Sequence, residues 1–152
     1  MSSLNDARLT MSDVTCSDFS EASERMLQLD LAVRTLRHAE ASYIAQMQEG
    51  VEAFTRPLRV CLTSHERSIL FQNIEKLVAV SEFVLAQVDD VVTSSNTQAA
   101  SVSDVCNVYT RNLRMLSTLY GEYVRGLPAA MRMLASLHEN NDVVEKLEVS
   151  LN

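Results

Sequence analysis

The sequence predicts an all-α protein, an elongated bundle of about four long helices. Apolar residues recur at steps of three and four over long stretches, as one face of a helix requires. The chain has only three glycines and two prolines in 152 residues. Because these are the residues that most often interrupt helices, long uninterrupted helical segments are possible. No stretch shows the pattern of a strand, so every element that we predict is a helix.

The first predicted helix follows a tail. Residues 1–17 are rich in Ser, Asp and Thr and lack periodicity, so we expect them to be a disordered tail before a domain that spans 18–152. The sequence DFSE fits a capping box with Asp18 as the N-cap. We expect this helix to run to about Leu58 and to be kinked or ended by Pro57, which supplies no N–H. Its buried stripe is Met26, Leu29, Val33, Leu36, Tyr43, Met47, Val51, Phe54 and Leu58.

A second capping box begins the next helix. In TSHE, Thr63 is a good N-cap and Glu66 stands at the third helical position. The helix is predicted to continue without a break through residues 66–92. Its apolar side chains are too many for one narrow stripe, which indicates packing against several neighbours.

The last third of the chain predicts two more helices. A polar loop over 93–103 precedes a third helix that ends near Arg125. Gly126 is expected to separate it from a fourth helix, because Pro128 suits the first position of a helix. The sequence NND at 140–142 is expected to interrupt that fourth helix.

Charge and composition exclude several classes of function. A formal net charge of −7 argues against nucleic-acid binding and against anionic membrane surfaces. No apolar run approaches the length of a membrane span, so no direct membrane insertion is expected. The three cysteines, at positions 16, 61 and 106, are widely spaced and odd in number, which favours reduced thiols in the cytoplasm.

No pattern of catalytic or metal-binding residues stands out. The three histidines, at positions 38, 65 and 138, do not form a ligand set, and no glycine-rich phosphate loop is present. Cysteine pairs at metal-binding spacing are also missing from the sequence. We therefore predict neither a metal nor a cofactor.

One carboxylate does stand out. Continuing the apolar stripe from Leu36 leads to Glu40 before it reaches Tyr43. Burial of an unpaired carboxylate costs several kcal/mol, so a partner is required. Two interpretations are open: Glu40 pairs with an Arg or Tyr of a neighbouring helix, or it faces a protein partner that supplies the pairing.

The surrounding sequence resembles a known family. LAVRTLRHAEASYIAQMQEGVEAFTRPL is similar to the first conserved region of Dbl-homology (RhoGEF) domains, roughly ELxxTExxYVxxLxxxxxxFxxPL. ERSILFQNIEKLVAVSEFVLAQV resembles their second region, and LSTLYGEYVRGLPAAMRMLASL resembles a later segment, closest to FYVE-containing exchange factors. The resemblance covers about residues 25 to 149 in the family's order. Its matching residues in the first region are Leu36, Glu40, Tyr43, Ile44, Met47, Phe54, Pro57 and Leu58.

The resemblance implies a guanine-nucleotide exchange factor for a Rho-family GTPase. Such domains stabilise the nucleotide-free GTPase and catalyse no covalent chemistry of their own. The family's glutamate, which contacts switch I, falls by position on Glu40, with Leu36 and Arg37 flanking the contact. The likeness to FYVE-containing factors points to Cdc42 as the GTPase.

The sequence departs from the family in one large respect. The third conserved region, with a QRxxRYPLL signature, has no match among these residues. We therefore expect weak or no exchange activity and an apolar face left by the missing helix, through which the chain could self-associate. The alternative function is an inactive Dbl-like binding or scaffolding protein that self-associates or binds another chain. A third possibility is an unrelated cytosolic helical bundle.

Overall fold

The computed structural model describes residues 12–94, 98–138, 144–145 and 148–149. These residues form helices and no strand, which confirms the all-α fold class. Short helical pieces at 144–145 and 148–149 follow the last long helix. The elements in order are α1 (Ser12–Gly50), the π-helix η1 (Val51–Thr55), α2 (Arg56–Leu58), α3 (Ser64–Leu70), α4 (Ile74–Ser94) and α5 (Gln98–Leu137).

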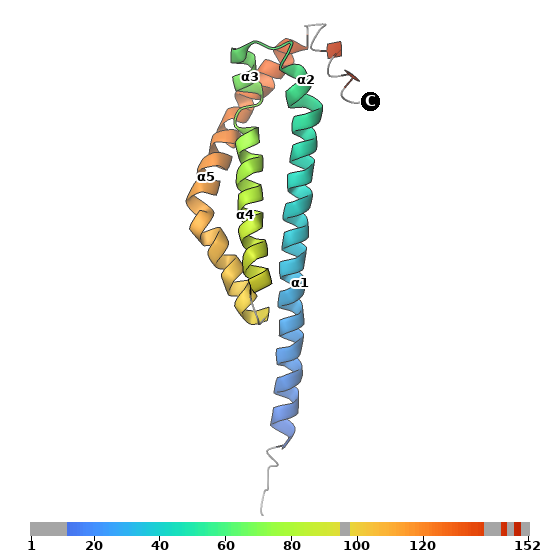
Figure 1. Cartoon of the computed structure of the whole chain (residues 1–152), viewed down its shortest axis with the longest axis vertical. Helices are drawn as coiled ribbons and strands as arrows, with labels where there is room; N and C mark the ends of the chain where they lie inside the picture. The colour runs from blue at the N-terminus through green and yellow to red at the C-terminus, as the bar shows by residue number, and fades with distance from the viewer. Residues whose placement is uncertain (1–11, 95–97, 139–143, 146–147, 150–152) are drawn as a thin grey trace, which may run out of the picture.

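The three long helices α1, α4 and α5 lie side by side (Figure 1). α4 runs antiparallel to α1, as two polar contacts between them show. The Arg37 guanidinium meets Asp89, and further along α1 the Gln48 amide donates to Glu82 at 2.5 Å. Residue numbers therefore rise along α1 as they fall along α4.

α5 runs parallel to α1. The Tyr109 hydroxyl contacts Glu40, and further along both helices the Tyr120 hydroxyl contacts Tyr43. A connection between parallel neighbours must cross the whole length of the bundle, and α4 makes that crossing. α4 is thereby packed against both neighbours, as its many apolar residues predict.

Two separate apolar clusters form the core. The first joins α1, α4 and α5, and the second joins α2 and the turn after it to the last turn of α5. Each fully buried Val or Leu contributes roughly 1.5–3 kcal/mol of transfer free energy. The members of the first cluster are Val33, Val84, Val88, Val105 and Val108, and those of the second are Leu58, Leu62 and Leu137.

The first helix begins earlier than predicted. α1 starts at Ser12, so Asp18 lies inside the helix and does not cap it. Residues 12–17 of the predicted disordered tail are helical, while residues 1–11 lie outside the described residues. The chain has no Gly or Pro between Ser12 and Gly50 to stop the helix, and adding residues to an existing helix costs little.

The end of the first helical segment follows the prediction. Helical structure continues through η1 and α2 to Leu58, next to Pro57. In η1 the N–H of Arg56 donates to the carbonyl of Val51, five residues back. Proline has no N–H and its ring crowds the preceding turn, so a wider turn before Pro57 relieves the clash that a regular α-helix would make.

The second predicted helix is interrupted. The capping box at Thr63 and Glu66 is confirmed, with both reciprocal hydrogen bonds present. The prediction of an unbroken helix is wrong, because α3 ends at Leu70 and α4 begins at Ile74. Between them Gln72 has a φ of 49°, in the left-handed region that ends helices. The Asn73 side chain fixes the new direction by donating to the carbonyl of Leu119 at 3.0 Å.

The third and fourth predicted helices are one helix. α5 begins at Gln98, within the predicted loop, and continues through Gly126 and Pro128 to Leu137, so the predicted separation is wrong. Pro128 leaves the carbonyl of Val124 without its helical donor. Both residues are exposed, so water can hydrate that carbonyl. The NND sequence lies outside the described residues.

Gly126 packs against the break at Gln72. A Cβ added to Gly126 would lie 1.8 Å from the Gln72 Oε1 atom, so the side chain of Gln72 would have to move. We expect Gly126→Ala to lower the free energy of unfolding by about 1 kcal/mol, since the clash outweighs the better helix propensity.

Adding Gln72→Gly should recover that loss, because glycine removes the obstructing side chain and adopts a positive φ without strain. Urea unfolding of the single and double variants measures both effects. Equal costs of Gly126→Ala with and without Gln72→Gly would contradict this contact.

Candidate functional site

The three predicted contact residues lie on neighbouring turns of α1, where it meets α4 and α5. Leu36 is half-buried and packs against the first apolar cluster. Arg37 and Glu40 are also half-buried, and each faces a different helix. The structure thus brings all three together on one part of α1.

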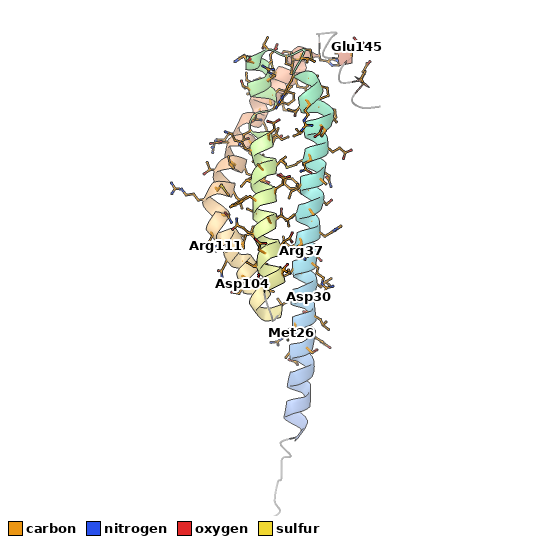
Figure 2. The ribbon with its side chains drawn as sticks, in the orientation of Figure 1. Met26, Asp30, Arg37, Asp104, Arg111 and Glu145 are labelled. Carbon is orange, nitrogen blue, oxygen red and sulfur yellow. The ribbon has the colours of Figure 1, made fainter. Side chains whose placement is uncertain are left out.

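Arg37 is joined to α4. Its guanidinium donates from Nε to Asp89 Oδ1 at 2.7 Å and from a terminal nitrogen to the same oxygen at 2.6 Å. The two side chains are 38% and 45% exposed, so water screens the pair and its contribution to stability is small. Figure 2 shows Arg37 pointing from α1 toward α4.

Glu40 is joined to α5. The Tyr109 hydroxyl donates a hydrogen bond to Glu40 Oε1 at 2.9 Å. Burial raises the pKa of the Tyr109 phenol above its usual range, and the hydrogen bond to Glu40 and its negative charge add to that rise. The interpretation in which Glu40 pairs with a Tyr of a neighbouring helix is therefore confirmed. A protein partner for Glu40 stays a prediction.

A chain of hydroxyl groups lies one turn further along α1. The Tyr120 hydroxyl of α5 donates to Tyr43 Oη at 3.0 Å and is also 3.0 Å from the Ser81 hydroxyl of α4. Burial raises the pKa of Tyr43, and the hydrogen bond with Tyr120 raises it further. These three groups tie all three long helices together beside Glu40.

Sequence reasoning missed the partners of the predicted site. Asp89, Tyr109 and Tyr120 lie on other elements, far along the chain from α1. The apolar stripe of α5 was visible at Val105 and Val108, and Tyr109 is adjacent to it in sequence. A tyrosine at the edge of such a stripe can place its ring on the core and its hydroxyl on a carboxylate.

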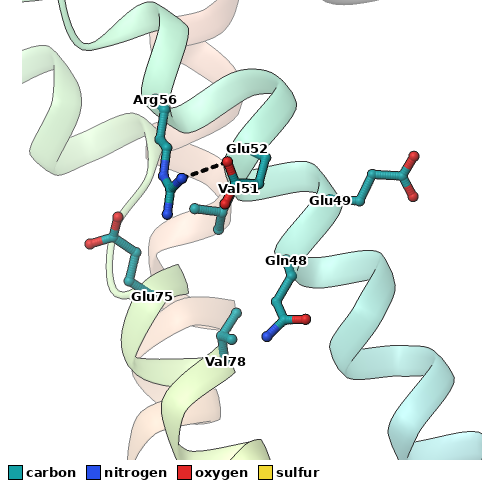
Figure 3. Close-up of a pocket in the computed structure, with 7 residues that line it drawn as sticks. All are labelled: Gln48, Glu49, Val51, Glu52, Arg56, Glu75 and Val78. Carbon is teal, nitrogen blue, oxygen red and sulfur yellow. Dashed lines mark hydrogen bonds and ion pairs between the residues drawn. The ribbon is translucent and has the colours of Figure 1, made fainter.

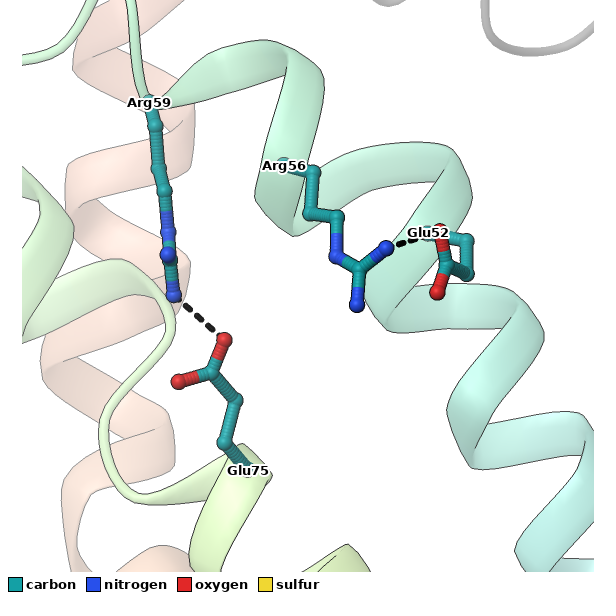
Figure 4. Close-up of polar contacts among 4 residues, drawn as sticks. All are labelled: Glu52, Arg56, Arg59 and Glu75. Atoms are coloured by element: carbon teal, nitrogen blue, oxygen red, sulfur yellow. Dashed lines mark hydrogen bonds and ion pairs between the residues drawn. The ribbon is translucent and has the colours of Figure 1, made fainter.

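A pocket of about 590 Å³ lies at the other end of the α1–α4 contact (Figure 3). Four charged side chains and one amide contribute to its wall. Glu52 pairs with Arg56 at 2.5 Å, and Glu75 pairs with Arg59 (Figure 4). Three of the four charges are thus paired, while Glu49 forms no ion pair among the described residues and points away from the other lining side chains (Figure 3).

Two further features bear on the kind of site. Within the described ranges, no three His, Cys, Asp or Glu side chains gather as a metal site would require. None of the described helices is both long and apolar enough to cross a membrane. The contacts around Glu40 are hydrogen bonds, an ion pair and apolar packing within the chain, and they join α1 to α4 and α5.

Comparison with known families decides the class. The family model of the RhoGEF domain matches residues 32–151, which is most of the chain. The chain belongs to the RhoGEF family. No curated protein and no solved structure matches it. The match to the RhoGEF domain includes Leu36, Arg37 and Glu40, and it confirms the resemblance seen in the sequence. The likeness to FYVE-containing factors stays a prediction.

Membership in the RhoGEF family implies exchange activity on Rho-family GTPases in general. Exchange factors of this kind bind a protein and change the affinity of that protein for its nucleotide. A RhoGEF domain is consistent with a helical surface that carries polar side chains in place of an enclosed catalytic cleft.

The raised pKa values of Tyr43 and Tyr109 predict a loss of stability in alkali. The folded chain holds these two protons more tightly than the unfolded chain, whose phenols titrate near pH 10. Their stabilising contribution is complete below pH 10 and falls as the pH rises beyond it. Tyr109→Phe and Tyr43→Phe should each make that fall less steep.

Urea unfolding between pH 8 and pH 11 measures this dependence. Tyr123→Phe is the matched control and should change the dependence least, since the charge of Tyr123 makes the smallest of the contributions that raise the pKa of Tyr43. The chain has no Trp, so absorbance at 295 nm reports tyrosinate directly. Full ionisation of all tyrosines near pH 10 in the folded chain would contradict the prediction.

Proposed function

We propose that this chain is a guanine-nucleotide exchange factor that binds a Rho-family GTPase through the face of α1 around Glu40. Membership in the RhoGEF family supports the class of partner. The half-buried carboxylate of Glu40 supports the face, because its Oε1 accepts one hydrogen bond from Tyr109. A carboxylate has about four lone-pair sites, so Glu40 can accept further bonds from a partner.

The proposed mechanism is differential binding. Glu40 would accept a charge-assisted hydrogen bond from the switch region of the GTPase only in the nucleotide-free state. Leu36 would add an apolar contact and Arg37 a cationic one on the same face. The GTPase then loses its nucleotide because the complex with the exchange factor is favoured over the nucleotide-bound form. No covalent bond is made or broken.

The internal contacts predict slow exchange. Tyr109 occupies one oxygen of Glu40, and Asp89 holds the guanidinium of Arg37. A GTPase must share or displace these partners, and the cost of displacing them is subtracted from its binding energy. We therefore propose that the isolated chain is a weak exchange factor.

Nucleotide release tests the proposal. Cdc42, Rac and Rho are loaded with a fluorescent GDP analogue, and Cdc42 is the GTPase that we expect to respond. The chain should accelerate release, and Glu40→Ala should reduce that acceleration roughly ten-fold or more, since a charged hydrogen bond is worth about 1.5–3 kcal/mol. Tyr109→Phe should increase it, because the carboxylate is released from its internal donor.

Glu49→Ala is the matched control, since Glu49 is an exposed glutamate of the same helix. Circular dichroism verifies that each variant keeps its helices. The proposal is wrong if Glu40→Ala and Glu49→Ala release nucleotide at the rate of the unchanged chain. It is also wrong if no GTPase responds to the chain or to Tyr109→Phe.

The second candidate function is a binding or scaffolding protein without exchange activity. The internal pairing of Arg37 and Glu40 favours it, because a GTPase would have to compete with Asp89 and Tyr109 for these side chains. Binding of a nucleotide-free GTPase without accelerated release would distinguish it from an exchange factor. A cytoplasmic location belongs to both proposals, and the free thiols of Cys61 and Cys106 support a reducing compartment.

A further inference from the structure

The N-terminal part of α1 extends beyond the other helices (Figure 1). We call residues 12–31 the N-terminal extension; it precedes residue 32, where the match to the RhoGEF domain begins. Met26 lies at the level where α4 ends and α5 begins, and α1 extends beyond it toward its N-terminus (Figure 2). The described side chains of residues 21–29 are all exposed. A helix without neighbours is marginally stable in water, so the extension gains stability by packing against another surface.

The extension carries the stripe of α1 that is buried elsewhere. Met26 and Leu29 continue the line of Val33 and Leu36, which pack in the first apolar cluster. In the extension the same line has no neighbour, and Met26 and Leu29 are 42% and 39% exposed. The face that binds α4 and α5 within the bundle is therefore available to another helix.

α5 presents a second group of exposed apolar side chains. Their positions differ by three, four or sums of these steps, so they lie on one side of the helix; between Leu113 and Val124 that side also carries Tyr120, which is bonded to Tyr43 and Ser81. Two of them, Val124 and Met131, are 60% and 65% exposed. An apolar line of this length on an exposed helix marks an interaction surface. The members of this α5 face are Leu113, Val124, Leu127, Met131 and Leu134.

The two surfaces have opposite charge. The extension has five carboxylates and one arginine, whereas α5 has four arginines and two carboxylates. Arg125 and Arg132 lie one heptad apart beside the α5 face and form no ion pair with a carboxylate among the described residues. The chain as a whole is acidic, with a net charge of −7. The net positive charge of α5 therefore attracts the net negative charge of the extension.

The two surfaces also match in length. The extension has 20 residues and the α5 face spans 22, so both are roughly 30 Å long at 1.5 Å per residue. The extension points away from the bundle and is continuous with α1, so it cannot fold back onto α5 of its own chain (Figure 1). It can reach α5 of a second copy.

We propose that two copies of this chain form a two-fold dimer in which the extension of each copy packs on the α5 face of the other. Within one copy α1 and α5 are parallel, so a two-fold axis across the helices places each extension antiparallel to the α5 that it contacts. The two-fold symmetry gives the dimer two equivalent contacts between an extension and an α5 face. A stable dimer buries roughly 1,200 Å² or more, and two such helix contacts contribute jointly to that area.

The dimer does not depend on nucleotide exchange. Neither surface includes Leu36, Arg37 or Glu40, so loss of exchange activity in a Glu40 variant would leave it intact. Light scattering after size-exclusion chromatography of the full chain should give twice the mass of the 17.0 kDa chain. Dissociation should increase with salt, because opposite charges face each other across the contact.

Two variants disrupt one surface each. Met26→Glu with Leu29→Glu changes the extension, and Val124→Glu with Met131→Glu changes the α5 face. Each variant should be monomeric, and circular dichroism should show that it remains helical. Mixed in equal amounts, the two variants should form a heterodimer, because one intact extension still meets one intact α5 face.

Leu27→Glu with Leu31→Glu is the matched control. These two side chains belong to the same extension and are 63% and 64% exposed, but they lie on another side of the helix from Met26. The control should remain dimeric. A charge change adds a second test: Arg125→Glu with Arg132→Glu should weaken the dimer, because it reverses the positive charge beside the α5 face.

Several results would overturn the proposal. An unchanged chain that is monomeric at 100 µM rules out the dimer. One variant that stays dimeric while the other is monomeric indicates pairing of like surfaces, α1 with α1 or α5 with α5. Monomeric variants that fail to associate when mixed show that the extension does not meet the α5 face. Dissociation of the control shows that the contact uses a different side of the extension. Dimers that survive both disrupting variants place the interface elsewhere.

Discussion

The Val108→Asp variant is expected to lose its helical fold at neutral pH. Val108 is 0% exposed and lies in the cluster where α1, α4 and α5 meet. The described side chains around it are valines and other apolar groups, so the carboxylate would find no donor. Burial of an unpaired charge costs several kcal/mol in addition to the lost packing. That sum is comparable to the whole stability of a typical domain, about 5–15 kcal/mol.

Far-ultraviolet circular dichroism and urea unfolding measure this effect. Val124→Asp is the matched control, because it makes the same change on the same helix at an exposed position. The control should unfold within about 0.5 kcal/mol of the unchanged chain when both are compared as monomers. A folded Val108→Asp protein with unchanged stability would mean that α5 does not pack through this residue.

The Leu58→Ala variant is expected to lose about 3 kcal/mol of unfolding free energy. Leu58 is 2% exposed and packs with Leu62 and Leu137 in the second cluster. Truncation of a buried leucine removes its transfer free energy and leaves a cavity, and such changes typically cost 2–5 kcal/mol. This cluster joins the end of the first helical segment to the last turn of α5, so its loss should loosen that end of the bundle first.

Hydrogen exchange distinguishes local from global loss. In Leu58→Ala the amides of α3 and of the last turns of α5 should exchange faster, while those in the middle of α4 keep more of their protection. Val60→Ala is the control, since Val60 is 82% exposed. Uniform acceleration along the whole chain would mean that the two clusters unfold as one unit.

Local signals in the sequence predicted the fold well where one side chain acts on its own backbone. The capping box at Thr63 is such a case, because both of its hydrogen bonds are made within four residues. The break at Gln72 could not be predicted in the same way. It depends on Asn73 contacting α5 and on the closeness of Gly126, which are contacts between residues distant in sequence.

Gly126 and Pro128 misled the prediction for a related reason. Their intrinsic preferences favour the end of one helix and the start of another. Leu137 and Met133 pack in the second cluster only if the helix continues through Gly126 and Pro128. The free energy of this tertiary packing exceeds the intrinsic preferences of Gly126 and Pro128.

The candidate site was partly predictable. Glu40 interrupts an apolar stripe, and that alone indicated a paired carboxylate. The identity of its partner required the structure, because Tyr109 is 69 residues away in sequence. A single sequence does not state which helices become neighbours, and the parallel arrangement of α1 and α5 determines this pairing.

The parallel arrangement of α1 and α5 also has consequences for the order of folding. The α4–α5 contact between Gln87 and Asn112 closes a segment of 25 residues, whereas α1 closes 34 residues in its bond from Gln48 to α4 and 69 in its bond from Glu40 to α5. Longer closures cost more chain entropy, so a hairpin of α4 and α5 should form first and α1 should join it last. The helix that carries Glu40 would then be the last to dock during folding and the first to leave during unfolding.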